Sequence, residues 1–121
     1  SLRARNASEE TPLLVASKYG RVRTIRLLLL LEEKLLRYTR ETDEHPLVDD
    51  LDNCGRNALH LCPDPEGIRI LLGAGCDVFK IDDLQRLPIA WAQRRGADPE
   101  VMELLGDAME KRHRHSHRRQ I

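Results

Sequence analysis

The chain has 121 residues, of which 33% are charged, 40% are hydrophobic and only 3% are aromatic, and its formal net charge is zero. This length is typical of one domain with a modest core. Because aromatic residues are so few, that core must be mainly aliphatic, as packed helices allow. No run of 18 apolar residues occurs, so we expect no membrane span.

The charge is distributed in blocks. Residues 1–40 carry a net charge of +5, residues 41–107 one of −9, and residues 108–121 one of +4. A nucleic-acid-binding protein needs one dominant basic face, so this alternation argues against specific nucleic-acid binding. The three cysteines have no C-x-x-C spacing and are expected to be free thiols of a reducing compartment. With no leader-like start and Ser1 in place of Met, we expect a segment of a larger intracellular protein, in the cytoplasm or nucleus.

The first expected helix begins near Thr11, in the segment T-P-L-L-V-A-S-K-Y-G. We expect the Thr11 hydroxyl to cap this helix by accepting a hydrogen bond from an N–H of the first turn. Pro12 suits the first helical position, where a missing N–H costs nothing. Gly20 suits the left-handed residue that commonly ends a helix.

A long second helix is expected over residues 22–40, because apolar residues recur there at helical spacing. We interpret the all-apolar residues 27–31 as a part of this helix that is buried on most sides. The apolar side chains among residues 35–38 need a cover of their own. The loop at residues 46–48, a partner protein or a second copy of the chain could supply it.

Two degraded copies of the first segment follow. N-A-L-H-L-C at residues 57–62 leads into L-L-G-A-G-C-D-V, and L-P-I-A-W-A at residues 87–92 leads into R-G. Thr11, Asn57 and Leu87 stand at the same position of the motif, 46 and 30 residues apart. Two prolines directly after the middle copy should cut its first helix short, because proline cannot continue a helix interior.

This pattern resembles the ankyrin-repeat family, whose signature contains T-P-L and whose period is about 33 residues. The resemblance covers roughly residues 4–108 and implies an all-α solenoid of stacked helix-turn-helix units. About three divergent repeats are expected, at residues 5–50, 51–80 and 81–108. Residues 109–121 form a basic His/Arg-rich tail, for which we expect a frayed helix end or a disordered segment. A nuclear-localisation signal and a metal site built from its histidines are the alternatives.

The resemblance also implies a function: a non-catalytic protein–protein interaction module of a larger scaffold or regulatory protein. Its partner would bind the hairpin turns, at residues 6–10, 52–56 and 82–86, and the concave face of the first helices. Several of the basic residues would share that face, so the expected partner is an acidic or phosphorylated protein segment. The candidate contact residues are Glu10, Lys18, Tyr19, Asn53, Arg56, Asp83, Arg86, Trp91, Arg94 and Arg95.

Other residues have structural interpretations. His60 stands at the family's histidine, which hydrogen-bonds the hairpin backbone between repeats. Gln85 stands where the family prefers a turn glycine. Trp91 aligns with apolar residues and is expected to be core or half-buried, with a binding anchor as the alternative. No paired acid and base or ligand spacing is visible, so we expect no enzyme activity, cofactor or metal. The alternative function is a self-associating or structural module that uses the helix at residues 22–40.

Overall fold

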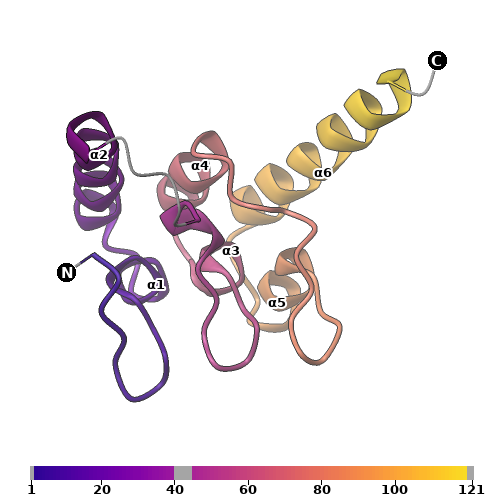
Figure 1. The fold of residues 1–121 in the computed structure, drawn as a ribbon. Helices are drawn as coiled ribbons and strands as arrows, with labels where there is room; N and C mark the ends of the chain where they lie inside the picture. The colour runs from indigo at the N-terminus through magenta and orange to yellow at the C-terminus, as the bar shows by residue number, and fades with distance from the viewer. Residues whose placement is uncertain (1, 40–44, 120–121) are drawn as a thin grey trace.

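The computed structural model describes residues 2–39 and 45–119, and the side chains of residues 2–38 and 45–113. Within these ranges the chain contains helices and no strand, which confirms the expected all-α class. The elements, drawn in Figure 1, are α1 (Pro12–Lys18), α2 (Val22–Thr39), the 3-10 turn η1 (Leu47–Asp49), α3 (Ala58–Leu61), α4 (Pro65–Gly73), α5 (Pro88–Arg94) and α6 (Pro99–Arg119).

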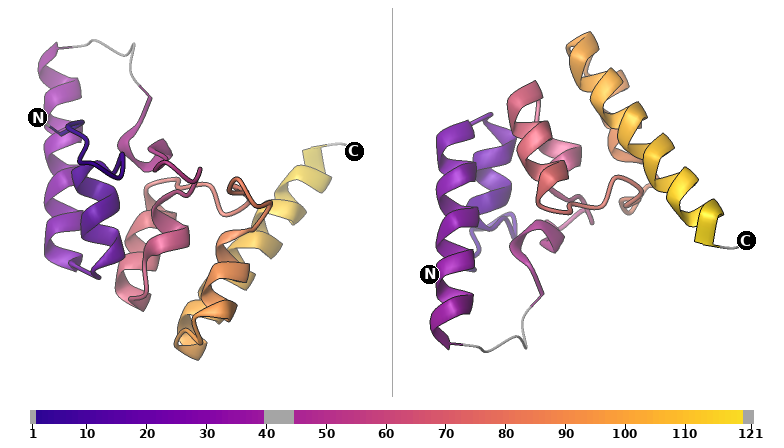
Figure 2. Two further views of the ribbon diagram at one scale, coloured as in Figure 1. Left: turned by 90° about the horizontal axis from the view of Figure 1, so that it is seen from below. Right: turned by 90° about the horizontal axis from the view of Figure 1, so that it is seen from above.

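The helices are arranged in three antiparallel pairs, α1 with α2, α3 with α4, and α5 with α6. The short helices α1, α3 and α5 contact one another in that order, and α4 lies between α2 and α6. Both views in Figure 2 show the same sequence of pairs from one end of the molecule to the other. The core between the two rows is aliphatic, as the composition predicted. Its fully buried side chains include Leu13, Leu14, Ile25, Leu59, Ile68, Leu71, Val101 and Leu105.

Most of the helices begin and end at the residue types that the sequence led us to expect. Proline occupies the first turn of α1, α4 and α5. Gly20 has φ +64°, the left-handed conformation expected at the end of α1. The expected cap by Thr11 is wrong in its detail: Thr11 is the N-cap residue, but its side chain makes no capping hydrogen bond. Its buried hydroxyl oxygen has no partner in the described part of the chain.

The prolines after α3 shorten it as predicted, to the four residues Ala58–Leu61. So short a helix cannot be stable alone, and its N-terminus has a complete capping box. The Asn57 side chain accepts hydrogen bonds from the N–H groups of Leu59 and His60, and the Asn57 N–H donates to the His60 ring. The Asp64 side chain then caps α4 by accepting from the N–H groups of Glu66 and Gly67.

The interpretation of residues 27–31 is wrong. Ile25 and Leu28 are buried, but Leu27, Leu30 and Leu31 are 53%, 47% and 38% exposed. The physical reason is that α2 lies at the end of the row and packs mainly on α1 and α4, with a further hydrogen bond from the Leu47 N–H to Glu32. Its leucines therefore surround the helix, while neighbouring helices cover only part of its circumference.

The loop at residues 46–48 does not cover the last turns of α2. Leu47 and Val48 are buried, yet Leu35, Leu36 and Tyr38 remain 51%, 45% and 91% exposed. This helix ends at Thr39, and its expected last residue, 40, lies outside the described residues. At the other end of the molecule, α6 continues through residue 108 without a break, so the expected tail begins as helix. No described helix has both the length and the apolar character that crossing a membrane requires.

Replacing glycine by alanine is expected to have opposite effects on stability at Gly67 and at Gly73 of α4. A Cβ at Gly67 would lie 2.6 Å from Cys62 Sγ and 3.4 Å from Ile25 Cδ1, whereas a Cβ at Gly73 would meet nothing within 4 Å. We expect Gly67→Ala to lower the free energy of unfolding by about 1 kcal/mol or more, because the added methyl group would overlap the sulfur of Cys62, at the end of α3, and crowd Ile25 of α2. Gly73→Ala should raise it by up to about 1 kcal/mol through helix propensity. Urea unfolding of both variants tests this, and equal effects would contradict the close packing of Gly67 against Cys62.

Candidate functional site

Three turns of the same construction precede the three short helices, at the ranges predicted from the sequence. In the third turn, Asp82 Oδ1 accepts hydrogen bonds from the N–H groups of Leu84 and Arg86, at 2.9 and 2.8 Å. Asp52 binds the second and fourth residues after it in the same way, and so does Asn6. In each turn the N–H of this first residue also donates to the carbonyl of the fifth, at 3.0 Å.

The fourth residue of every turn has a positive φ: +62° at Glu9, +75° at Gly55 and +63° at Gln85. Only glycine adopts this conformation without steric cost. Gln85 adopts it at the position where the resemblance implies a preference for glycine. The second and third turns also touch, because the Asp83 N–H donates to the Cys54 carbonyl at 2.9 Å.

His60 joins the second and third turns from inside. Its Nδ1 accepts from the Asn57 N–H at 3.0 Å, so its Nε2 carries the proton and donates to the Arg86 carbonyl at 2.9 Å. The ring is fully buried, and burial lowers the pKa of His60 below its usual value, although the hydrogen bond to Arg86 opposes this. The expected hydrogen bond from His60 to a hairpin backbone is thus present, with the imidazole neutral.

Trp91 of α5 is half-buried, as expected, between two arginines of successive turns. Its Nε1 donates to Asp82 Oδ2 at 2.7 Å. The guanidinium carbons of Arg56 and Arg86 lie 5.1 and 5.6 Å from the centre of its ring, within the range of cation–π attraction. Arg56, Arg86 and Trp91 are the candidate residues that the fold brings together; we call them the Trp91 cluster.

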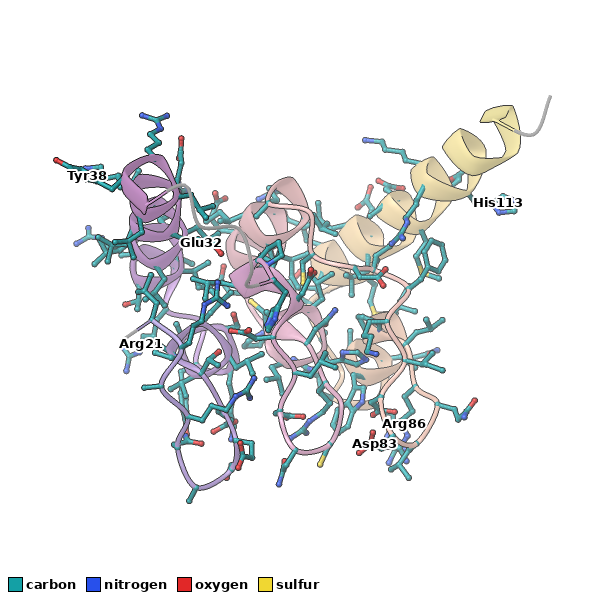
Figure 3. The ribbon with its side chains drawn as sticks, in the orientation of Figure 1. Arg21, Glu32, Tyr38, Asp83, Arg86 and His113 are labelled. Atoms are coloured by element: carbon teal, nitrogen blue, oxygen red, sulfur yellow. The ribbon has the colours of Figure 1, made fainter. Side chains whose placement is uncertain are left out.

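The two arginines of the Trp91 cluster differ in their electrostatic environment. Arg56 Nε lies 2.7 Å from Asp52 Oδ2, a fully buried side chain, and forms an ion pair with it. For Arg86 no ion pair is found among the described residues, so none of the described carboxylates pairs directly with its positive charge; its guanidinium carbon lies near the Trp91 ring instead. Figure 3 shows Arg86 and Asp83 together on the third turn, at the end of the molecule opposite Tyr38 and His113.

Asp82 remains ionised beneath this cluster. Burial opposes ionisation, but hydrogen bonds from Trp91 and from the N–H groups of Arg86 and Leu84 outweigh burial and lower the pKa of Asp82 below its usual value. Sequence reasoning did not single out Asp82 or its equivalent Asp52. The signal was present: a side-chain acceptor stands five residues before Thr11, Asn57 and Leu87 alike.

The candidates of the first turn form a separate group. Glu10 is 7% exposed, and its carboxylate is bound by Asn6 Nδ2 at 3.0 Å and by Lys18 Nζ at 3.5 Å. It therefore stabilises its own turn and presents little surface to a partner. Lys18 also lies 5.7 Å from the centre of the Tyr19 ring, and Tyr19 is 63% exposed.

Arg94 and Arg95 have different roles in the structure. Arg95 reaches back to α3, where its guanidinium donates to the carbonyls of His60 and Leu61 at the C-terminus of that helix. Burial lowers the pKa of Arg95 below its usual value, and its donors complete the short helix. Arg94 and Arg95 are both exposed, as are Asn53 and Asp83 on the turns.

Two of the three cysteine thiols are buried. Cys62 and Cys76 are free thiols in the core; burial raises the pKa of Cys62, and it raises the pKa of Cys76 to about 12. Cys54 is free and exposed. No cluster of three His, Cys, Asp or Glu side chains able to hold a metal ion occurs among residues 2–38 and 45–113.

Comparison with known proteins gives no match: no family model matches the chain, and neither does any curated protein. The chain's own repetition is therefore the basis for interpreting the site. The same turn, followed by a short helix, occurs three times, and two of the three turns contribute an arginine to one tryptophan.

The neutral, buried His60 predicts how stability changes with pH. Because the pKa of His60 is lower in the folded chain than its usual 6.5, the unfolded chain binds the proton more readily as the pH falls below about 6.5. The contribution of His60 is complete above this pH and is lost below it, by at most about 1.4 kcal/mol per pH unit. Urea unfolding from pH 7.5 to 5.5 measures the loss.

The control is His60→Gln, which removes the titrating group. This variant should be less stable at pH 7.5 and should show a flatter pH profile than the original chain. In the nuclear magnetic resonance spectrum, the His60 ring signals should titrate with a midpoint below 6.5. A midpoint at or above 6.5, with the same pH profile in both proteins, would contradict a buried neutral imidazole.

Proposed function

We propose that the chain is a divergent ankyrin-repeat module of about three repeats, at residues 5–50, 51–80 and 81–108. Three turns with the same hydrogen bonds, each followed by a short and a longer helix, support this assignment. So does the order of contacts, in which each helix pair packs on the next. The irregular spacing has local causes: a long α2 lengthens the first unit, and two prolines shorten the second.

The function that we propose is binding of an acidic segment of a partner protein across the turns and the adjacent short helices. The observation that carries this proposal is the charge of Arg86, which pairs with none of the described carboxylates and lies beside the half-buried ring of Trp91. Opposite charge on a partner would steer its approach and fix its orientation. A phosphorylated segment is included, because a guanidinium binds phosphate oxygens through two donors at once.

The Trp91 cluster suits a contact surface because two of its three side chains are already fixed. Asp82 accepts a hydrogen bond from the Trp91 indole, Asp52 pairs with Arg56, and both carboxylates also bind backbone N–H groups of their turns. A partner would therefore have to order only Arg86, which lowers the entropic cost of association. Aromatic and arginine side chains of this kind often dominate the energy of protein interfaces.

We further propose that the module acts by binding and not by catalysis, within a larger intracellular scaffold or regulatory protein. Both ring nitrogens of His60 are engaged by the backbone, so the imidazole is committed to structure. The raised pKa values of Cys62 and Cys76 disfavour the reactive thiolate. No cofactor or metal enters the proposed function.

Selection from a random peptide library displayed on phage tests the proposed function with the whole chain as bait. The enriched peptides should be rich in Asp and Glu. Arg86→Glu should weaken the binding of their synthetic counterparts at least tenfold, which is about 1.4 kcal/mol, because this cation is replaced by an anion. Fluorescence polarisation measures the affinities.

The matched control is Lys111→Glu, which makes the same change of charge on the exposed surface of α6. It should leave the affinities unchanged, since this part of α6, marked by His113 in Figure 3, lies far from Arg86. Circular dichroism establishes that both variants are folded. Peptides without an acidic excess, or an equal loss in the two variants, would contradict a specific role for Arg86.

A further inference from the structure

A row of exposed residues runs along α2, on the side of the helix that faces away from the core. Its members are spaced three and four residues apart in alternation, which is the heptad spacing of a helix–helix contact. Leu27, Leu31 and Tyr38 in this row are 53%, 38% and 91% exposed. We call this row the α2 seam; it consists of Thr24, Leu27, Leu31, Lys34 and Tyr38.

The α2 seam is separate from the residues with which α2 packs into the molecule. Ile25 and Leu28 are buried, and a Cβ on Gly67 of α4 would be 3.4 Å from Ile25. The leucines of the seam therefore make an apolar patch beyond what the fold needs. Contiguous exposed apolar surface of this kind marks interaction sites in soluble proteins.

An open apolar hollow lies at the foot of the α2 seam. It has a volume of about 510 Å³ and lies between the first turn, α1 and the start of α2. Pro12, Val15 and Tyr19 line it, and Thr24 belongs both to the hollow and to the seam. A large apolar side chain that entered the hollow would anchor a ligand lying along the seam.

Positive charge borders this surface. Arg21, at the hollow, and Arg23 and Lys34, along α2, have no ion pair in the part of the chain that the structure describes. The neighbouring Arg26 and Arg37, by contrast, are paired with Glu66 and Glu33. Figure 3 shows Arg21 and Tyr38 on the same outer side of the molecule, far from Arg86. These unpaired cations favour an anionic ligand.

The charges also distinguish between three possible ligands of the α2 seam: a second copy of the chain, a lipid surface and a helix of a partner protein. Pairing two copies of the seam would bring Arg23 and Lys34 of one copy toward the same cations of the other, which is unfavourable. A helix that lies on a lipid surface keeps its cations on the polar face. Lys34 instead interrupts the apolar row itself, four residues before Tyr38, as a polar residue does in a specific helix pairing.

We propose that the α2 seam and its hollow bind an amphipathic helix of a partner protein, with apolar residues at heptad spacing and acidic residues beside them. One bulky apolar side chain enters the hollow, and carboxylates pair with Arg21, Arg23 and Lys34. This surface is distinct from the Trp91 cluster and does not depend on the function proposed for that cluster.

The test uses the full chain and a labelled synthetic peptide of three heptads. The peptide has Leu at the two apolar positions of each heptad and Glu at the positions beside them. A second peptide carries Lys in place of each Glu. The chain should bind the Glu peptide at least tenfold more tightly than the Lys peptide, in fluorescence polarisation at 50 mM salt. Raising the salt to 500 mM should reduce that preference, because the cations are exposed.

Single substitutions locate the binding surface. Leu31→Asp should weaken binding of the Glu peptide at least tenfold. Leu36→Asp is the matched control: Leu36 is similarly exposed, at 45% against 38%, but lies five residues farther along α2 and thus on another side. The affinity of the Leu36→Asp variant for the Glu peptide should equal that of the original chain. Circular dichroism and the unfolding midpoint establish that both variants are folded, and a Leu27→Asp variant replaces Leu31→Asp if the latter unfolds.

Three results would overturn the proposal. The first is equal binding, or no binding, of the two peptides. The second is a dimer of the chain alone that sedimentation detects and Leu31→Asp dissociates, because the occupant would then be a second copy. The third is co-sedimentation with phosphatidylserine vesicles in a Leu31-dependent manner while the Glu peptide does not bind. Preferential binding of the Glu peptide, lost in Leu31→Asp and retained in Leu36→Asp, supports the proposal.

Discussion

In each of the three turns that precede a short helix, the side chain of the first residue accepts hydrogen bonds from two backbone N–H groups of the same turn. Asn6, Asp52 and Asp82 each do so. Buried backbone donors need such partners, and the same acceptor geometry forces the fourth residue into a left-handed conformation. Because the three turns have one shape, the short helices that follow them leave in the same direction and can pack side by side.

The Trp91 cluster depends on this construction. Asp83 binds the Cys54 carbonyl and His60 binds the Arg86 carbonyl, so the second and third turns stand at a fixed separation. Only at this separation can arginines from both turns reach one indole ring. The second carboxylate oxygens of Asp52 and Asp82, left over from the turns, bind Arg56 and Trp91. The same residues thus fold the turns and position the surface side chains.

The middle of the stack shows how a short element is stabilised by its neighbours. Helix α3 has only four residues, and a free helix of that length is unstable in water. A capping box at its start and the guanidinium of Arg95 at its end bind the backbone groups that the short helix leaves unpaired. Arg95 directly follows α5, as its C-cap residue, so the second and third helix pairs are connected at both ends of α3.

The sequence was sufficient to predict the turns and the class of fold, through a motif that occurs three times and its resemblance to a known family, and to predict the shortened α3, through the two prolines that follow it. It was not sufficient to predict the exposed face of α2. Residues 27–31 are apolar in every direction, and only the place of α2 at the end of the row determines which of them are covered. The hydrogen bonds from Arg95 to the carbonyls of α3 were not predicted either, because those partners lie 34 and 35 residues away, beyond the reach of any local pattern.

The second and third turns are joined directly, through the hydrogen bond from the Asp83 N–H to the Cys54 carbonyl. Scalar coupling across a hydrogen bond, measured by nuclear magnetic resonance between the Asp83 nitrogen and the Cys54 carbonyl carbon, reports on this bond alone. A resolved coupling, with an Asp83 amide that exchanges slowly with solvent, is the result that the account predicts. An Asp83 amide that exchanges as fast as that of an open loop, with no coupling to Cys54, would contradict it.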